Sequence, residues 1–206
     1  MSKKGLFITF EGTDGVGKST QIRLLKSKLD EKGIEVVLTR EPGGTDISEK
    51  IRDIILSKDN SEISYMTEAM LYAASRAQLV AQIIKPALEQ GKTVISDRFI
   101  DSSIVYQGYG RKLGNAVYEI NKYAVGDCMP DVTFLLKLDP DTGIKRASGE
   151  EPDRIESEDI SYHRSVYQAY EKLEEEYPDR IIGIDATGSP KAVNESIMKR
   201  IDRLLG

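Results

Sequence analysis

The stretch Gly12-Thr13-Asp14-Gly15-Val16-Gly17-Lys18-Ser19 decides the fold of this 206-residue chain, because it spells G-x-x-x-x-G-K-S. Glycines let successive backbone N–H groups turn inward around phosphates, the lysine brings a positive charge to the β- and γ-phosphates, and the serine hydroxyl can bind Mg²⁺. The pattern predicts a phosphate-binding loop for a nucleoside triphosphate. We expect its binding residues to be Gly12, Thr13, Asp14, Gly15, Val16, Gly17, Lys18, Ser19 and Thr20.

The sequence on both sides of the loop gives the context that such a loop requires. The preceding run Leu6-Phe7-Ile8-Thr9-Phe10 is mostly apolar, as expected for a parallel strand that is buried on both faces. After the loop, Ile22, Leu25 and Leu29 fall on one face of a helix that ends near Gly33. The bound phosphate would therefore face the N-terminus of a helix, where backbone N–H groups are available to bind it.

Length, charge and cysteine content narrow the functional class. The chain suits one α/β domain spanning residues 1–206. A net charge of −5 gives no general attraction to nucleic acid or to an anionic membrane, so we expect small-molecule partners. Cys128, the only cysteine, excludes an intramolecular disulfide framework and predicts a buried or half-buried thiol. No apolar stretch approaches the ~20 residues that span a bilayer, so we expect a cytoplasmic protein.

Short apolar runs alternate with helical patterns along the whole chain. This alternation predicts an α/β fold, a five-stranded parallel sheet flanked by helices on both faces, with ligands at the carboxyl ends of the strands. The strands are predicted at residues 6–10, 36–38, 93–95, 132–136 and 181–184. The helices are predicted at about 18–32, 46–57, 65–90, 114–125, 158–177 and 190–204.

Two of these helices carry specific predictions. Asp46 and Glu49 form a capping pair that would open the second helix. Pro86 is expected to bend the third helix without ending it, and Gly91 to stop it. The apolar face of the second helix is predicted to bury Ile47, Ile51, Ile54 and Ile55.

The segment from Asp139 to Asp159 is rich in charged residues and poor in apolar ones. Prolines and glycines interrupt it, which favours a short lid over about residues 140–158 that could move. His163, the sole histidine, follows in the next helix and is expected at its surface. We therefore expect no histidine-based acid/base chemistry.

Unusual polar residues follow the second and third strands. Thr39-Arg40-Glu41-Pro42-Gly43-Gly44-Thr45 comes after the second strand, and Asp97-Arg98-Phe99 comes after the third. On the long third helix, Tyr72 and Arg76 are four residues apart and share a face. An aromatic platform beside a guanidinium fork suits a nucleobase.

These motifs together resemble the thymidylate kinase family along nearly the whole chain. The resemblance rests on Phe10-Glu11-Gly12, residues 39–44, Thr67-Glu68-Ala69-Met70-Leu71-Tyr72-Ala73-Ala74-Ser75-Arg76, residues 97–103, Tyr106-Gln107-Gly108 and Asp153-Arg154-Ile155-Glu156. It implies a P-loop kinase fold that works as a homodimer. It also implies transfer of a phosphoryl group from ATP to dTMP, giving ADP and dTDP for dTTP synthesis, with Mg²⁺ as cofactor.

The resemblance assigns the nucleobase site residue by residue. Tyr72 would stack on thymine, and Arg76 would donate to the pyrimidine O4, a position where cytosine presents an amino donor instead. Gln107, together with Ser103, would read the other edge of the ring. Tyr106 matches the tyrosine that crowds the 2′ position of the sugar and so favours deoxyribose.

The resemblance also assigns the phosphates and the metal. Asp14 would accept a hydrogen bond from the 3′-hydroxyl and support catalysis, and Glu41 would have a supporting role. Asp97 would hold Mg²⁺ together with Ser19. The residues expected to clamp the substrate phosphate are Arg40, Arg52 and Arg98, with Arg98 and Lys18 also catalytic.

The transition-state arginine is where this chain departs from its relatives. Some members of the family carry a basic residue in the phosphate loop at the position of Gly15, and others carry it in the lid. Ser148 stands in the lid where an arginine would be expected. Arg146 is therefore predicted to be the catalytic arginine finger, and Arg154 to steady the base and phosphates of ATP.

Three other functions would share the phosphate loop. A kinase acting on dCMP, UMP or a nucleoside is the nearest, and the Tyr72/Arg76 pair argues against it. A GTPase needs N-K-x-D after a strand, whereas Asn121-Lys122-Tyr123-Ala124 lacks the acid and lies in a helical stretch. A non-catalytic nucleotide-binding protein would not require a second phosphate clamp.

Overall fold

One parallel sheet organises the computed structural model, which describes residues 5–147 and 153–205. Its strand order is β2-β3-β1-β4-β5, with β1 in the centre. Ile8 of β1 lies opposite Ile95 of β3 on one side and Val132 of β4 on the other. The strands are β1 (Phe7–Glu11), β2 (Val36–Arg40), β3 (Thr93–Asp97), β4 (Val132–Lys137) and β5 (Ile181–Asp185). The predicted five-stranded parallel sheet is confirmed.

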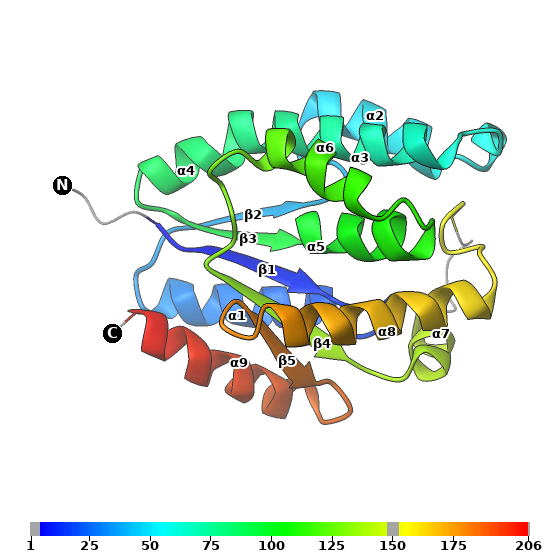
Figure 1. Ribbon diagram of the computed structural model, residues 1–206. Coiled ribbons are helices and arrows are strands. Elements are labelled where there is room, and N and C mark those ends of the chain that lie inside the picture. Colours follow the sequence, from blue (N-terminus) through cyan, green and yellow to red (C-terminus); the bar gives the residue numbers. More distant parts are fainter. Residues whose placement is uncertain (1–4, 148–152, 206) are drawn as a thin grey trace.

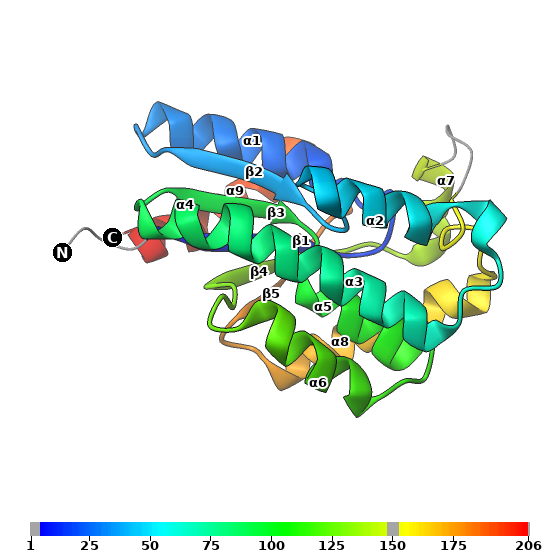
Figure 2. The ribbon, with the colours of Figure 1, turned by 90° about the horizontal axis from the view of Figure 1, so that it is seen from above.

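Helices cover both faces of the sheet (Figures 1 and 2). Because successive side chains of a strand point to opposite faces, Phe7 packs in one apolar cluster and Ile8 in the other. The cluster around Ile8 holds α1 (Lys18–Glu31) and α9 (Pro190–Leu205). The cluster around Phe7 holds α3 (Tyr65–Leu79), α6 (Asn115–Val125) and α8 (Ile160–Glu176), with short α4 (Lys85–Glu89).

All six predicted helices are present, and besides the short 3₁₀ turn Lys58–Asn60 two helical segments were missed. The first runs from α5 (Ile100–Ser103) through a π-helical stretch, Ile104–Gly110. The second is α7 (Pro140–Ala147). Its start had a signal in the sequence, because Asp139 accepts from the N–H of Thr142 and proline suits the first helical position. None of the helices formed by the described residues is long and apolar enough to cross a membrane.

The predicted cap and buried face of α2 (Asp46–Leu56) were partly wrong. The N-cap is Thr45, whose hydroxyl accepts from the N–H of Ser48, and Glu49 reaches back to the N–H of Gly44. Ile55 is buried and Ile51 half-buried as predicted, but two isoleucines face outward, Ile47 at 51% and Ile54 at 46% exposure. The reason is that α2 packs against α3 along a narrower stripe than its apolar residues span.

The long third helix continues through Pro86 and ends at Glu89, so that prediction is confirmed. A π-helical turn, Val80–Ile84, directly precedes the α4 segment that contains the proline. Gly91 follows with a φ of 78°, a left-handed conformation that suits glycine after a helix.

His163 is buried, which corrects the prediction that it lies at the surface. Its ring contacts the ring of Tyr162 edge to face, with 5.8 Å between centroids. Periodicity predicted α8 correctly but could not show which of its faces the neighbouring elements cover. Cys128 is buried, as predicted.

Candidate active site

The phosphate-binding loop connects β1 to α1 at the carboxyl edge of the sheet. Gly12 has a φ of 134°, and a Cβ there would lie 2.6 Å from the carbonyl oxygen of Leu136, so only glycine fits. Lys18 opens α1 and donates from Nζ to the carbonyl oxygens of Gly12 and Thr13, both at 3.2 Å. Burial and the neighbouring Arg98 guanidinium lower the pKa of Lys18. The ammonium group of Lys18 therefore lies over the backbone of the loop. A bound phosphate could replace the two carbonyl oxygens as its hydrogen-bond partner.

A pocket at this loop gathers most of the residues predicted to bind phosphate and metal. The predicted residues that line it are Asp14, Gly15, Gly17, Lys18, Ser19, Thr20, Arg40, Arg52, Asp97 and Arg98. Arg40 pairs with Glu49 at 2.9 Å, and Arg52 donates to the carbonyl oxygen of Pro42 at 3.0 Å. The structure thus brings together three arginines from different parts of the chain at one pocket, as the prediction of a phosphate clamp requires.

The donor set in this pocket fits Mg²⁺. The hydroxyl of Ser19 lies 3.5 Å from a carboxylate oxygen of Asp97, so two hard oxygen ligands converge on one place. Among the described residues there is no cluster of three or more His, Cys, Asp or Glu side chains that could form an all-protein cage. Mg²⁺ commonly uses one or two protein ligands and takes its other ligands from phosphates and water. Ser19 and Asp97 would supply two ligands and leave the other positions to the phosphates and water.

Arg98 sits at the centre of the site in a left-handed backbone conformation, with a φ of 67°. Such a conformation is unfavourable for a residue with a Cβ, so neighbours must hold it. The buried carboxylate of Glu11 accepts from the N–H of Phe99 at 2.8 Å and from the N–H of Ser102 at 3.2 Å, in the segment that directly follows Arg98. Tyr170 donates to the same carboxylate at 2.7 Å. Glu11 therefore fixes the turn that presents Arg98.

Asp14 pairs with two cations at the phosphate loop. Its Oδ1 accepts from Arg98 at 2.7 Å and lies 3.8 Å from the Nζ of Lys18. Burial opposes ionisation of Asp14, but Arg98 and Lys18 outweigh it and lower its pKa to about 2. His163 adds to this lowering. Asp14 is an ionised acceptor at neutral pH.

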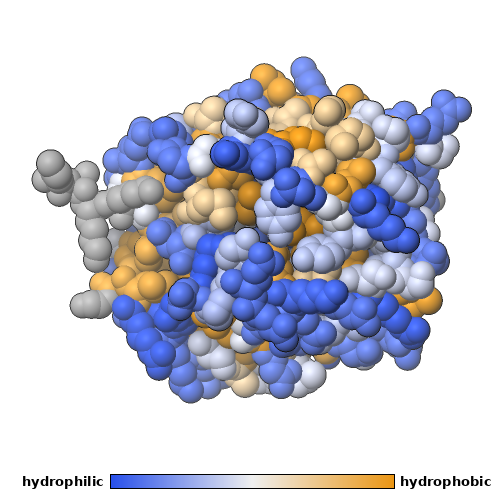
Figure 3. Space-filling view, in the orientation of Figure 1, coloured by the Kyte–Doolittle hydropathy of each residue, from blue (hydrophilic) through white to orange (hydrophobic). Residues whose placement is uncertain are grey.

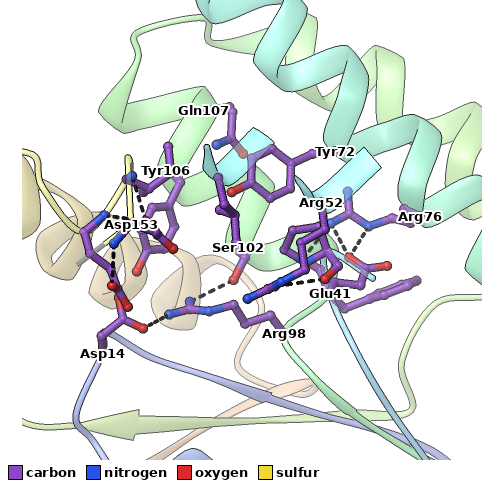
Figure 4. Close-up of a pocket in the computed structure, with 15 residues that line it drawn as sticks. Asp14, Glu41, Arg52, Tyr72, Arg76, Arg98, Ser102, Tyr106, Gln107 and Asp153 are labelled. Atoms are coloured by element: carbon purple, nitrogen blue, oxygen red, sulfur yellow. Dashed lines mark hydrogen bonds and ion pairs between the residues drawn. The ribbon is translucent and has the colours of Figure 1, made fainter. Parts of the chain in front are cut away.

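A second pocket adjoins the first and contains the predicted nucleobase residues (Figure 4). Tyr72, Arg76, Tyr106 and Gln107 line it, with Ser102 in place of the predicted Ser103. The hydroxyl of Tyr106 is buried and has no hydrogen-bond partner among the described residues. Burial also raises its pKa, so the hydroxyl keeps its proton. The other residues that line this second pocket are Asp14, Glu41, Pro42, Arg52, Leu56, Arg98, Phe99, Asp153, Ile155 and Glu156.

Arg76 is fully engaged with the protein and only 1% exposed. Its Nε and Nη2 donate to Glu41, the former at 2.8 Å, and Nη2 also donates to the carbonyl oxygen of Phe99. Its Nη1 donates to Ser103 and Asn121. All five N–H groups of the guanidinium are therefore used, and the predicted bond to O4 requires one of them to change partner.

Glu41 is the other half of this buried pair. Burial raises its pKa to about 7, although Arg76 acts in the opposite direction. Its Oε1 has no hydrogen-bond partner among the described residues. Asn121, which the GTPase alternative would need as a guanine reader, lies buried in α6 and is bound to Arg76. The prediction that this stretch is helical is confirmed.

The structure does not bring Arg154 to the phosphate loop. Its Nη2 donates to Glu68 at 2.7 Å, and its Nε donates to the carbonyl oxygen of Ile55 at 2.9 Å. Its neighbours Asp153 and Glu156 do line the second pocket. The two belong to one tight turn, in which the carboxylate of Asp153 accepts from the N–H of Glu156. The predicted contact of Arg154 with ATP therefore stays a prediction that this arrangement does not support.

Arg146 is exposed near the end of α7 and lines neither pocket. The same helix touches the phosphate loop closely, because a Cβ on Gly143 would lie 2.6 Å from the carbonyl oxygen of Asp14. Arg146 follows Gly143 by three residues and so shares that face of the helix. Ser148, whose identity raised the question of the catalytic arginine, lies outside the described residues, as do Gly149 and Pro152.

Comparison with known proteins agrees with this geometry. A family model described as Thymidylate kinase matches residues 10–197. The chain is 48% identical over 203 residues to the thymidylate kinase of Halothermothrix orenii, covering 96% of this chain and 97% of that relative. It is 46% identical over 203 residues to that of an Exiguobacterium species, covering 97% and 96%.

A solved structure extends the likeness to three dimensions. The crystal structure of thymidylate kinase from Ehrlichia chaffeensis matches with a TM-score of 0.79 and 33% identity, covering 96% of this chain and 99% of that one. The likeness therefore includes the central sheet, the phosphate loop and the segment around the second pocket. With a family model over most of its length and near-full-length relatives, the chain belongs to the thymidylate kinase family.

Proposed function

We propose that this chain transfers the γ-phosphoryl group of ATP to dTMP, giving ADP and dTDP. The observation that carries the proposal is that the phosphate-loop pocket and the nucleobase pocket share a wall. Both pockets are lined by Asp14, Glu41, Arg52, Arg98 and Glu156. Two nucleotides bound in these pockets would point their phosphates at the same arginines.

The reaction needs alignment and charge neutralisation more than it needs a covalent partner. An oxygen of the dTMP phosphate forms the new bond to the γ-phosphorus, and the bond from that phosphorus to the bridging oxygen of ADP breaks. Lys18 and Arg98 lie where they can offset the negative charge on the transferring group, and Asp14 can hold the 3′-hydroxyl. Mg²⁺, held by Ser19 and Asp97, would neutralise charge on the phosphates of ATP.

The direct test mixes the protein with ATP, Mg²⁺ and dTMP and separates the nucleotides. We expect ADP and dTDP in equal amounts, and no dTDP when EDTA removes the divalent ion. A control without dTMP should release little ADP, because the arginines at the shared wall would have no acceptor phosphate to align. ADP formed without dTDP would instead indicate an ATPase or a binding protein, and would contradict the proposal.

The pocket also predicts an order of acceptors, with dTMP first, dUMP weaker and dCMP poor. dUMP lacks the methyl contact, and one missing methyl costs only about 1–3 kcal/mol. In dCMP an amino group replaces O4, so a hydrogen-bond donor of the base would face the donor of Arg76. This repulsion discriminates more strongly than a missing methyl group. Specificity constants for the three acceptors with the same enzyme preparation measure this order. Equal constants for dCMP and dTMP would remove Tyr72 and Arg76 from base reading.

Replacing Arg76 is a poor test of base reading in this protein. Its removal would leave the buried carboxylate of Glu41 without its partner. Breaking a buried pair on one side costs about 3–5 kcal/mol of folding stability. A loss of activity in Arg76→Ala could therefore come from unfolding, which is why the acceptor panel is measured on the unmodified protein.

We further propose that the protein is a homodimer joined through α2, α3 and α6. These helices pack side by side and leave large apolar side chains exposed, with Met70 at 54% and Tyr123 at 86%. Ile47 and Ile54, the two residues wrongly predicted to be buried within one chain, lie on α2 of the same layer. Apolar side chains gather over this region along the upper edge of Figure 3. A second copy of the chain, packed against these three helices, would bury these exposed apolar side chains.

The dimer is tested by measuring the mass in solution. We expect twice the 23.0 kDa chain mass, falling to the chain mass in Met70→Glu, because a charge in the centre of the contact costs its desolvation. Tyr177→Glu at the end of α8 is the matched control and should stay dimeric. A monomer in the unmodified protein at micromolar concentration would contradict the proposal.

We also propose that the protein is one kinase domain over residues 1–206. Since its reaction consumes ATP, we place it in the cytoplasm.

A further inference from the structure

Glu68 is a buried carboxylate that links the nucleobase pocket to Arg154, in the C-terminal part of the predicted lid. It lies on α3 with 0% exposure, and it is not itself a lining residue of either pocket. Its Oε1 accepts from Gln107 Nε2 at 3.0 Å and from Arg111 at 3.3 Å. Its Oε2 accepts from Arg154 at 2.7 Å and from Arg111 at 3.3 Å. Two arginines balance its charge, so Glu68 can stay buried and still act as an acceptor toward Gln107.

This arrangement decides which end of the Gln107 amide faces the pocket. An ionised carboxylate only accepts hydrogen bonds, so it selects the NH₂ end of the amide and repels the carbonyl end. With Nε2 committed to Glu68, the carbonyl oxygen Oε1 is the end left for the pocket that Gln107 lines. No described residue donates a hydrogen bond to that oxygen. Figure 4 shows the amide beside the ring of Tyr72, the predicted stacking platform.

We propose that Glu68 is a positioning residue for base selection, which holds Gln107 so that its carbonyl oxygen accepts the N3–H of the pyrimidine. This inference rests on the proposed function. Thymine and uracil carry a hydrogen on N3, whereas cytosine carries a lone pair there, so a fixed carbonyl acceptor attracts the first two and repels the third. An amide free to turn over would present its NH₂ end equally well and would lose that discrimination.

The test is Glu68→Gln, which keeps the shape of the side chain and removes its acceptor-only character. The carboxamide can donate or accept, so the Gln107 amide becomes free to turn. We expect the ratio of kcat/KM for dTMP to that for dCMP to fall about tenfold, which corresponds to ~1.4 kcal/mol. A merely structural role would lower both specificity constants together and leave the ratio unchanged. An unchanged ratio therefore overturns the proposal.

The chain offers a matched control. Glu158 also pairs with Arg111, at 2.6 Å, whereas the hydrogen bond of the Gln107 amide goes to Glu68. Glu158→Gln removes one negative charge from the same arginine and should keep the dTMP-to-dCMP ratio of the unmodified protein. If Glu158→Gln lowers the ratio as much as Glu68→Gln does, the effect comes from the charge cluster and not from the amide, and the proposal falls.

Two further measurements do not depend on the folding of Glu68→Gln. The unmodified protein should use dTMP methylated at N3 at least tenfold less well than dTMP, because the methyl group removes the hydrogen that Oε1 accepts. Gln107→Met, which has no carbonyl, should lose the dTMP preference to the same extent. Equal use of the methylated nucleotide overturns the proposal. If dTMP itself gives no dTDP with the unmodified protein, the proposed function has failed instead.

Discussion

Arg146→Ala is expected to lower kcat by on the order of 10³-fold while leaving the KM for dTMP nearly unchanged. An arginine that reaches the transferring phosphoryl group stabilises charge that exists only in the transition state. Gly143 brings the backbone of α7 against the carbonyl oxygen of Asp14, and Arg146 shares that helical face. Arg146 does not line the phosphate-loop pocket in this structure, so the proposed role requires α7 to move toward that pocket. Single-turnover and steady-state kinetics with saturating ATP measure the change.

Two variants separate this role from a general loss of charge. Lys145→Ala removes a neighbouring positive charge from another face of the same helix and should retain most of the activity. Arg146→Lys keeps the charge but loses the planar fork, and should recover only part of kcat. A fall of less than tenfold in Arg146→Ala, or a loss seen mainly as weaker dTMP binding, would contradict the assignment. Arg154 would then return as a candidate, although it would first have to leave Glu68.

Lys18→Ala is expected to lower turnover by on the order of 10²-fold or more with the fold retained. Within the described part of the chain, the ammonium group donates to two loop carbonyl oxygens and forms an ion pair with Asp14 at 3.8 Å. Asp14 keeps Arg98 as its partner when Lys18 is removed, so no buried charge on the loop is left unpaired. Its pKa is lowered by burial and by Arg98, yet the nearby Asp14 and the phosphates of a bound nucleotide favour the charged form. Steady-state kinetics together with thermal unfolding measure both parts of the prediction.

The control for Lys18 is on the same helix. Lys26 pairs with Asp30 at the exposed surface of α1, so Lys26→Ala should keep full turnover. Full activity in Lys18→Ala would remove the residue from the mechanism. A large drop in melting temperature in Lys18→Ala, absent from Lys26→Ala, would show that the lysine stabilises the loop more than the transition state.

Elements whose signal is local were predictable from the sequence. The phosphate loop is defined by its own glycines, Lys18 and Ser19, and each strand is a short apolar run next to a helical pattern. Parallel strands then bring Asp97 and Arg98 to the same edge as the loop, because right-handed crossovers leave few other arrangements. The family resemblance added the residues of the nucleobase pocket, and most of them do line it.

Buried partners could not be predicted, because they depend on contacts between residues far apart in the chain. Glu11 is 91 residues from Ser102, Glu68 is 86 from Arg154, and Arg76 is 45 from Asn121. Each pair includes a charged side chain, a residue type that is usually exposed. Its burial is stable only when the fold supplies hydrogen-bond or ion-pair partners.

The same limit explains Ile47, Ile54 and His163. Periodicity shows which residues share a helical face but not what covers that face. The sequence by itself determined the sheet, the loop and the class of chemistry, since those follow from local pattern and from the handedness of connections. Only the tertiary structure decided which donors are already taken, as with Arg76 and Arg154, and which acceptor is left facing the substrate, as with Gln107. Hydrogen bonding saturates each donor and acceptor, so the free ones are known only when every partner is in place.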